Sequence, residues 1–483
     1  MLREFSNTFY AFQSPALTTV INSLTHCDFD TVESEAVTRA FQLRYNGPVE
    51  TSTENSLKNL IVKKYGGTSV GSIERIESLA DRLAREIAQG QKPVVVVSAM
   101  SGETNRLIAL AEKIDPDYRG SAYDMLIASG EQVSISLLAI ALQKRGIKAQ
   151  PLLAYQLGIR TDSMAAKARI QSIDVEPLLE LVGKGFVPVV AGFQGVDEDD
   201  NITTLGRGGS DTTAVALAAA IAAQWEGGSS GIGFLGCEIY TDVPAVFTAD
   251  PRLVARAKEI PFLSCEEMME MAALGSKVLH IRCVEIAAKY GVKIHLRSTF
   301  EEREGTWILP EGAWDDMGKT TKIQIEQPVV SAVTHDANTA VFNLFPVPEG
   351  PDFLARLFDN LAKRGVVVDI ITQSKTVEGQ RLAFSVTKED IPLSRQALKD
   401  FIANSDSISL IENMAKISVV GVGMRNHPGV AARFFSVLAK QGIAIQIVTT
   451  SEIKISAVID QSQLKDAAEA LHTEFGLDAG PAT

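Results

Sequence analysis

Short apolar runs and longer amphipathic runs alternate between residue 60 and about residue 300 of this chain. Runs rich in β-branched residues predict strands at 61–64, 93–97, 149–154, 187–192, 239–241 and 292–296. Apolar residues at helical spacing predict helices between them, among them 73–87, 122–144, 212–223 and 266–290 with breaks. This alternation predicts an α/β domain with a mostly parallel sheet and ligands at the carboxyl ends of its strands.

The last third of the chain contains an internal repeat. Residues 353–374 and 430–451 are identical at ten of 22 positions, at a constant offset of 77. Each copy predicts an amphipathic helix that ends at Gly365 or Gly442, within the β-α-β-β-α-β order of a ferredoxin-like unit. The first copy has a fourth strand at 408–411, whereas the second copy has none after Phe475. We therefore expect a segment before the first copy, about 321–333, to complete the second.

Composition narrows the class of protein. The 483 residues carry a formal net charge of −13, which disfavours a general role with nucleic acid. The apolar runs predict no membrane-spanning segment, and residues 1–58 lack the apolar core of a secretory signal. Histidines and cysteines are scattered, so we expect reduced thiols and no zinc site. These features predict a cytoplasmic protein with no membrane partner.

The stretch Thr204-Leu-Gly-Arg-Gly-Gly-Ser-Asp211 follows a predicted strand and opens a predicted helix. Its glycines let the backbone approach a ligand closely, and a helix N-terminus supplies free N–H groups with a partial positive charge. Arg207 adds a cation that can hold a carboxylate or phosphate with two hydrogen bonds. The stretch predicts an anion site, and the plainer alternative is a polar turn.

A second glycine site, Lys63-Lys64-Tyr-Gly-Gly-Thr-Ser69, follows the strand at 61–64. Gly66 and Gly71 have the spacing of a P-loop, but Ser72-Ile73 stands where a P-loop has lysine and a hydroxyl residue. A lysine before the glycines suits a polyphosphate, because an ammonium group is a point charge without geometric demands. The alternative is a surface lysine before a turn.

Seven motifs in order give the chain a resemblance to the aspartate kinases, of the monofunctional bacterial type with two ACT domains. The motifs lie at 64–69, 97–102, 129–131, 206–211, 240–243, 248–252 and 276–280. The resemblance implies an amino-acid-kinase fold, a mostly parallel sheet with helices on both faces, followed by tandem ferredoxin-like ACT domains. It implies these boundaries: an N-terminal extension of unknown role at 1–58, a catalytic domain at 59–310, a first ACT domain with its preceding strand at 321–412 and a second at 413–483.

The implied reaction is phosphorylation of the side-chain carboxylate of L-aspartate by ATP with Mg²⁺, which gives 4-phospho-L-aspartate. This reaction opens the synthesis of lysine, threonine, methionine and diaminopimelate. A carboxylate nucleophile is already ionised at neutral pH, so the protein mainly has to hold two anions together and neutralise charge. No metal site made of protein groups alone is expected, because Mg²⁺ is usually held through substrate phosphates.

The resemblance also assigns residues to the site. Lys64 holds phosphate, Lys277 is a second cation near the nucleotide and Asp211 orients the lysines. Glu131 faces the ammonium group of aspartate and Arg207 its α-carboxylate. The ATP contacts implied are Lys64, Tyr65, Gly66, Gly67, Ser98, Thr241, Asp242, Phe247, Thr248, Asp250, Pro251, Arg252 and Lys277. The aspartate contacts implied are Thr68, Ser69, Glu131, Arg207, Gly208, Gly209 and Ser210.

The repeats imply control by an amino acid, lysine or threonine or both, and assembly into a homodimer or a larger homo-oligomer. The effector contacts implied are in the second copy: Met424, Arg425, His427, Thr450, Ser451 and Glu452. Two other functions compete with this interpretation. A kinase of the same fold acting on another acid or nucleotide is disfavoured by the pair Glu131 and Arg207. A catalytically silent amino-acid sensor is disfavoured by Lys64, Asp211 and Lys277.

Overall fold

The computed structural model describes most of the chain after residue 57. The described residues are 58–224, 234–276, 278–313, 330–399, 401, 407–422, 424, 427 and 429–479. The predicted site residues Lys277 and Arg425 and residues 1–57 of the N-terminal extension lie outside the described residues.

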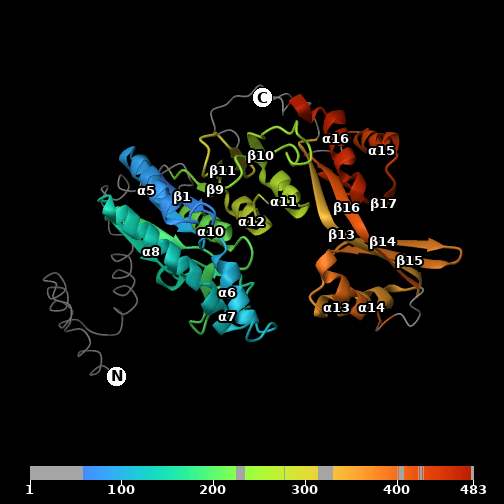
Figure 1. The fold of residues 1–483 in the computed structure, drawn as a ribbon, viewed down its shortest axis with the longest axis horizontal. Coiled ribbons are helices and arrows are strands. Elements are labelled where there is room, and N and C mark those ends of the chain that lie inside the picture. The colour runs from blue at the N-terminus through green and yellow to red at the C-terminus, as the bar shows by residue number, and fades with distance from the viewer. Residues whose placement is uncertain are drawn as a thin grey trace, which may run out of the picture. The chain divides into compact units, whose positions relative to one another are not determined.

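An eight-stranded sheet forms the core of the part of the chain before residue 313 (Figure 1). Its strand order is β10-β12-β11-β9-β1-β2-β6-β3. Neighbouring strands are parallel except β11 and β12. All six strands predicted from the sequence belong to this sheet, which adds β10 and β12 at one edge. The strands are β1 (Leu60–Tyr65), β2 (Lys92–Val97), β3 (Ala149–Leu152), β6 (Val187–Ala191), β9 (Cys237–Thr241), β10 (Phe262–Ser264), β11 (Ile294–Ser298) and β12 (Thr306–Leu309).

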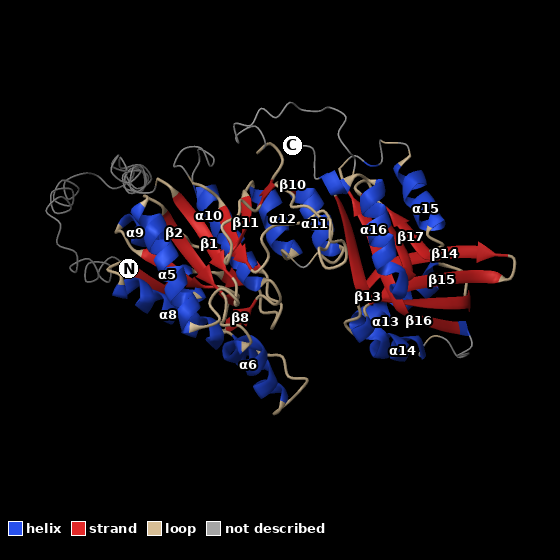
Figure 2. Cartoon of the chain, turned by 45° about the horizontal axis from the view of Figure 1, so that its top comes forward, coloured by secondary structure: helices blue, strands red, loops and turns tan. Residues whose placement is uncertain are grey.

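Helices cover both faces of this sheet (Figure 2). One face packs against α9 (Glu176–Gly183), α10 (Gly209–Gln224), α11 (Cys265–Ala273) and α12 (Ile281–Tyr290), and the other against α5 (Ile73–Ala88) and α8 (Ser129–Lys144). In α5, Ile76, Leu79, Ala80 and Leu83 form one buried stripe, and Ser72 caps the N-terminus. Because side chains alternate along a strand, consecutive residues of β1 face different helices.

One predicted helix is two helices in the structure. The run at 122–144 divides into α7 (Ser121–Ile127) and α8, and α6 (Glu103–Glu112) precedes them. By length and composition alone the stretch Ser121–Lys144 could cross a membrane, and 56% of its apolar window is buried inside the fold. Its apolar character is therefore accounted for by packing: α8 buries Ile135, Leu138 and Leu142 against the sheet.

A small four-stranded sheet, β5-β4-β7-β8, lies beside the main sheet in the fold and was not predicted. Its strands are β4 (Arg160–Thr161), β5 (Ile170–Ser172), β7 (Gln194–Val196) and β8 (Ile202–Thr204). The glycine-rich stretch at 204–211 therefore follows β8 and not the main-sheet strand β6. The carboxyl end of β6 still reaches it, because a Cβ on Gly192 would lie 2.7 Å from the Cβ of Ser210.

The last third folds around one continuous sheet in the order β14-β15-β13-β16-β18-β17. The first repeat contributes α13 (Pro351–Lys363), β14 (Val368–Thr376), β15 (Gly379–Val386) and α14 (Ile391–Lys399), and the second α15 (Val430–Lys440), β17 (Ile445–Thr450), β18 (Lys454–Asp460) and α16 (Leu464–Glu474). Two long strands, β13 (Ala332–Val347) and β16 (Ile408–Val420), belong to both repeats.

The strand that completes the second repeat lies before the first repeat, in the part of the chain where it was expected. Residues 332–336 of β13 pair antiparallel with 416–420 of β16, which pairs in turn with β18. This strand begins at Ala332, so it takes only the end of the expected segment, and 321–329 lie outside the described residues. The boundary expected between 412 and 413 falls inside β16.

Candidate active site

The carboxyl ends of four parallel strands bring the predicted motifs to one edge of the main sheet. Backbone hydrogen bonds link these ends in sequence: Gly66 N–H to Tyr240 O (3.3 Å), Ser98 N–H to Tyr65 O (3.1 Å) and Gly192 N–H to Val97 O (3.0 Å). The Gly66-Gly67 turn, the Ser98 motif and the segment after β6 are thereby neighbours, as expected for ligand sites of open α/β sheets.

A cavity of about 910 Å³ opens at this edge. Residues assigned from the sequence to phosphate, nucleotide and aspartate contribute to its wall. These are Lys64, Ser98, Glu131, Arg207, Gly208, Gly209, Ser210 and Asp211.

Lys64 and Asp211 form an ion pair at the wall of the cavity. The distance between Lys64 Nζ and Asp211 Oδ1 is 2.6 Å, and both side chains are largely buried. Asp211 lies in the first turn of α10, and Lys64 lies on the strand face that packs on this helix. The pair fixes the ammonium group beside the N-terminus of a helix, where partial positive charge adds to its own.

Glu131 carries an unpartnered carboxylate oxygen in the cavity wall. Its Oε1 accepts a hydrogen bond from Ala99 N–H (2.9 Å), whereas its Oε2 is buried without a protein partner. The side chain is about 3% exposed, and burial raises the pKa of Glu131 to about 7. A buried acceptor without a donor is costly, so the site favours a ligand that brings a positively charged donor.

We expect aspartate binding to strengthen as the pH rises through about 7, because the ammonium group of the ligand favours the ionised form of Glu131. The KM for aspartate, measured between about pH 6 and 8.5, should fall across this window and then level off. In Glu131→Gln the KM should be high at every pH. Without ligand, the raised pKa makes ionisation of Glu131 reduce stability as the pH rises from 4.5 to about 7, since the unfolded chain loses the proton first. A wild-type KM that rises with pH would contradict this assignment.

The turn before α10 requires glycine at Gly208. Its φ is +67°, and a Cβ there would lie 2.2 Å from the Cβ of His280, which caps α12. Gly208→Ala should therefore displace the turn from α12 and lower kcat/KM for aspartate by about tenfold or more. Gly146→Ala is a matched control, because Gly146 has a φ of +76° but open space around it. That change should cost about 1 kcal/mol of backbone strain and leave activity unchanged. Steady-state kinetics and thermal unfolding of both variants test the difference.

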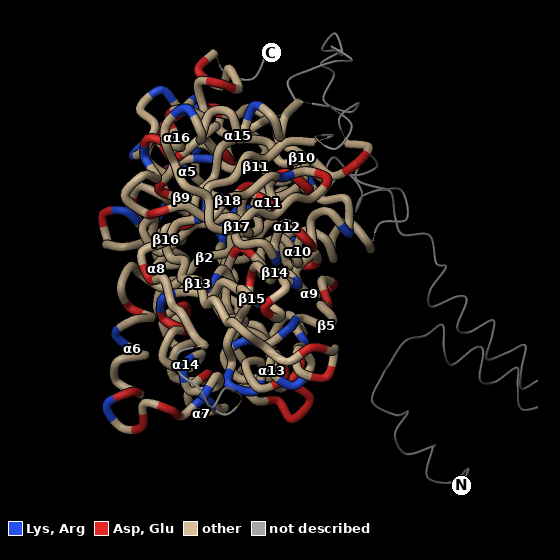
Figure 3. The backbone as a smooth tube through the Cα atoms, turned by 90° about the vertical axis from the view of Figure 1, so that its right-hand side faces the viewer, with Lys and Arg blue, Asp and Glu red and all other residues tan. Residues whose placement is uncertain are grey.

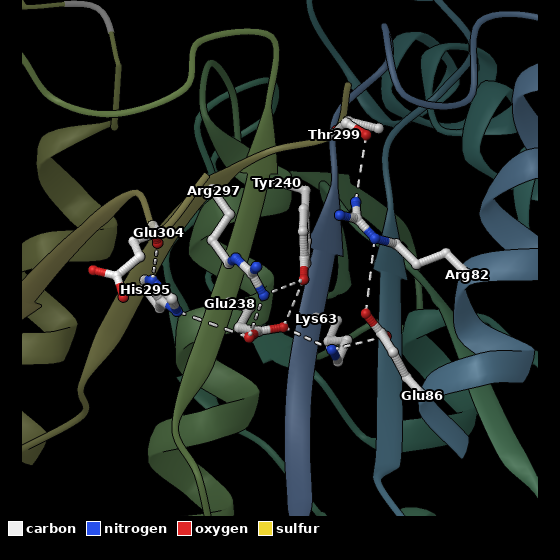
Figure 4. A network of polar contacts seen from close by, with 9 residues as sticks. All are labelled: Lys63, Arg82, Glu86, Glu238, Tyr240, His295, Arg297, Thr299 and Glu304. Atoms are coloured by element: carbon white, nitrogen blue, oxygen red, sulfur yellow. Dashed lines mark hydrogen bonds and ion pairs between the residues drawn. The ribbon is translucent and has the colours of Figure 1, made fainter. Parts of the chain in front are cut away.

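Lys63, the neighbour of Lys64, faces the other side of the sheet and lies in a buried charge network (Figure 4). Lys63 Nζ is 2.9 Å from Glu86 Oε2 of α5 and 2.7 Å from Glu238 Oε2 of β9, and its side chain is 1% exposed. Tyr240 Oη donates to Glu238 (2.9 Å), and Arg297 is 3.5 Å from the same carboxylate. Despite burial, the His295, Lys63 and Arg297 interactions hold the pKa of Glu238 far below its usual range. The network ties β1, β9, β11 and α5 together and so fixes the strand that carries Lys64.

Several residues assigned to ATP or aspartate lie outside the cavity wall. Tyr65 stacks on Tyr240 in the core of the α5 face, because its position in β1 gives it the orientation of Lys63. Ser69 Oγ is hydrogen-bonded to Thr299 Oγ1 (2.6 Å), and the carbonyl of Thr68 accepts from Arg75. Gly66 and Gly67 form the turn after β1, and a Cβ on Gly67 would lie 2.8 Å from Ala99 O.

The segment 241–252 diverges from the cavity toward the second repeat. Thr241 and Asp242 lie at the carboxyl end of β9, whereas Phe247 pairs with Glu259. Thr248 is fully buried, and its Oγ1 is 2.8 Å from His472 Nε2 of α16, so its side chain is not available to a nucleotide. Asp250, next to Pro251, is bound by Arg252 (Arg252 Nη2 to Asp250 Oδ2, 2.7 Å).

Three cations in the cavity wall were missed in the sequence: Lys167, Arg169 and Arg282. The first two lie between the short strands β4 and β5, in a segment that gave no periodic signal. With Lys64 and Arg207 they make five cationic side chains in the wall against two acids, Glu131 and Asp211. Elsewhere, basic and acidic residues are interspersed along the described elements (Figure 3). The excess of positive charge in the cavity suits polyanionic ligands.

Comparison with known proteins decides the family. Residues 59–298 match the model of the amino acid kinase family, and residues 417–475 match that of an ACT domain. An aspartate kinase of Stutzerimonas stutzeri is 45% identical over 423 residues, which cover 87% of this chain and 98% of the relative. The chain belongs to the aspartate kinase family. Aspartokinase 2 of Bacillus subtilis is 42% identical over 424 residues, covering 87% of this chain and 99% of that protein.

A solved structure supports the aspartate kinase fold. The crystal structure of Escherichia coli aspartokinase III in complex with aspartate and ADP matches with a TM-score of 0.68 at 23% identity, covering 86% of this chain and 99% of that chain. The expected fold class, an amino-acid-kinase domain followed by ACT repeats, is confirmed. The family implies the use of ATP, and the cavity of this aspartate kinase fits an anionic nucleotide in its volume and its excess of cations.

The effector residues expected in this aspartate kinase belong to two segments of the second repeat, 424–427 and 450–452. Met424 is buried in the core of the second repeat, so its side chain does not face a ligand. His427 is exposed, as are Thr450, Ser451 and Glu452 at and after the end of β17. Arg425 lies outside the described residues.

Proposed function

We propose that this chain transfers the γ-phosphoryl group of ATP to the side-chain carboxylate of L-aspartate, giving ADP and 4-phospho-L-aspartate. The observation that carries the proposal is that one cavity wall contains both the Lys64–Asp211 ion pair and two groups of opposite charge, Glu131 and Arg207. An α-amino acid presents an ammonium group and an α-carboxylate, and these two side chains complement them. A simple monocarboxylate would leave the buried Oε2 of Glu131 without a partner.

The side-chain carboxylate of aspartate is the nucleophile. One of its oxygens forms a bond to the γ-phosphorus while the bond from that phosphorus to the β–γ bridging oxygen breaks, and ADP leaves with the electron pair. Lys64, held by Asp211, and the N–H groups at the start of α10 neutralise charge on the transferred group. Gly67 allows the turn after β1 to pass close to Ala99 O, and Ser98 supplies a hydroxyl at the same edge. We assign Lys277 the role of a further cation on the nucleotide phosphates.

Mg²⁺ enters the proposal as an ion bound mainly through phosphate oxygens. Among the described residues, no group of three or more His, Cys, Asp and Glu side chains is placed to hold a metal. Because Glu131 is assigned to the ammonium group of aspartate, Asp211 is the acid of the cavity wall left for a hydrated ion, which takes at most one or two protein oxygens. When bound, Mg²⁺ would neutralise charge on the phosphates of the nucleotide.

The test is formation of an acyl phosphate from L-aspartate and MgATP, trapped with hydroxylamine, with and without lysine and threonine. Aspartate-dependent product that falls with either amino acid supports both the kinase and its control through the ACT repeats. Product that neither amino acid affects supports the kinase alone. Folded protein that forms no acyl phosphate overturns the proposal.

We assign lysine, threonine or both as the effector, with His427, Arg425, Thr450, Ser451 and Glu452 as candidate contacts. We also propose a homodimer or larger homo-oligomer in the cytoplasm, assembled through the ACT repeats. Light scattering at several protein concentrations measures the mass of the assembly, and a monomer at all of them would contradict this part of the proposal.

A further inference from the structure

Two segments that carry cations of the cavity wall are held together by side chains from two separate helices. The first segment is the 162–169 loop between β4 and β5, which carries Lys167 and Arg169. The second is the 204–208 segment, from the last residue of β8 to the residue before α10, which carries Arg207. One backbone hydrogen bond, from Ala168 N–H to Thr204 O (2.9 Å), joins the two segments directly.

Asp124 of α7 binds both segments. Its side chain accepts hydrogen bonds from Ala166 N–H (3.0 Å to Oδ1 and 3.1 Å to Oδ2), Thr204 N–H (3.0 Å to Oδ2) and Thr204 Oγ1 (2.8 Å to Oδ1). Asp124 is about 1% exposed, so no water competes for these donors. A buried carboxylate with this many donors is a strong fixed point for the backbone.

Arg282 of α12 binds the same two segments through their carbonyls. Its Nη1 donates to Leu205 O (2.6 Å) and its Nη2 to Ala168 O (3.0 Å). Both terminal nitrogens are therefore engaged by the backbone, although the residue lines the cavity. Asp124 thus accepts hydrogen bonds from these two segments, and Arg282 donates hydrogen bonds to them. The bonded residues lie 42 to 114 positions away from Asp124 or Arg282 in the chain.

We propose that Asp124 and Arg282 are positioning residues that set the 162–169 loop and the 204–208 segment at a fixed spacing, and so place Arg207 for the α-carboxylate of aspartate. Gly206 is part of this arrangement, because a Cβ on it would lie 2.9 Å from Ala166 O. The inference rests on the proposed aspartate kinase activity. It concerns the aspartate half of the cavity only, since Lys64 and the Gly66-Gly67 turn are fixed through β1, β2 and β9.

Asp124→Asn tests the proposal with almost no change of volume. Either orientation of the amide places its NH₂ group against the N–H of Ala166, and one of them also against the N–H of Thr204, because both carboxylate oxygens accept from backbone donors. We expect the KM for aspartate to rise at least about tenfold, while the KM for ATP changes less than about threefold. Hydrogen exchange at the amides of Ala166, Ala168 and Thr204 should speed up in the variant.

Asp197→Asn is the matched control. Asp197 also accepts backbone N–H bonds in a turn, from Asp199 (3.0 Å) and Asn201 (2.9 Å), but at the other end of β8. The Asp197→Asn substitution should lower thermal stability without changing the KM for aspartate. Arg282→Met should raise that KM as Asp124→Asn does, and the double variant should be little worse than the poorer single one, since both free the same unit.

The outcomes separate this inference from the proposed function. Wild-type protein that forms no acyl phosphate from aspartate overturns the proposed function. Active wild type with Asp124→Asn of normal aspartate KM overturns the positioning role. Equal increases in the KM values for aspartate and ATP, with exchange faster throughout the catalytic part, indicate general destabilisation and also overturn it.

Discussion

Replacing Lys64 with alanine should lower kcat by about a thousandfold, because the change removes a preorganised cation from the charge that develops in phosphoryl transfer. The KM for aspartate should change much less, since Glu131 and Arg207 remain in place. Stopped assays with hydroxylamine trapping measure the residual turnover. Asp211→Asn should give a smaller loss, because Lys64 keeps its charge but loses the partner 2.6 Å away that orients it.

Lys148→Ala is the control for this experiment. Lys148 directly precedes β3, at the amino ends of the parallel strands, whereas the cavity lies at their carboxyl ends. Its Nζ lies 5.7 Å from the ring centroid of Phe186. Its removal should leave turnover unchanged. Turnover of Lys64→Ala within a few fold of the wild type would contradict the role of Lys64 in phosphate binding.

Lys63→Met should destabilise the folded protein by about 3–5 kcal/mol, because it leaves the largely buried carboxylates of Glu86 and Glu238 without their shared cation. Equilibrium unfolding in urea measures this loss as a lower midpoint. The effect falls on stability, since Lys63 faces α5 whereas Lys64 faces α10. At temperatures where the variant is folded, its KM for aspartate should be close to that of the wild type.

Lys184→Met provides the comparison for a surface pair. Lys184 directly follows α9, and its Nζ lies 3.0 Å from Oε2 of Glu180, four residues earlier. Both side chains are more than half exposed. Its replacement should change the free energy of unfolding by less than about 0.5 kcal/mol. If Lys63→Met is equally mild, the buried network does not hold β1 as inferred.

The parts of the site that could be predicted from the sequence are those encoded locally. Lys64 and Gly67 belong to one short motif after a strand, and Arg207 to Asp211 belong to another before a helix. Tyr65 was assigned to the nucleotide because it lies in the first motif, but the alternation of side chains along β1 directs it to the opposite face. Applying the two-residue period inside the motif would have placed its side chain on that face.

Other features depend on contacts that leave no local pattern. Asp124 and Arg282 act on backbone groups 42 to 114 positions away, and nothing in their own segments distinguishes them from ordinary helix residues. Thr248 meets His472 across 224 positions, so its burial could not be read from its motif. The β7–β8 hairpin did have a local signal, since the turn residues Asp197 to Asn201 interrupt the apolar pattern.

The two shared strands make the regulatory repeats inseparable by simple truncation. A gene fragment that starts at residue 413 would lose the part of β13 that pairs with 416–420, and β16 would present an open edge to other chains. A fragment that stops at 412 would keep a strand, 332–336, with its partner removed. The two repeats are thus interlaced, and a regulatory fragment that keeps these strand pairings has to include β13 through α16, from Ala332 to Glu474.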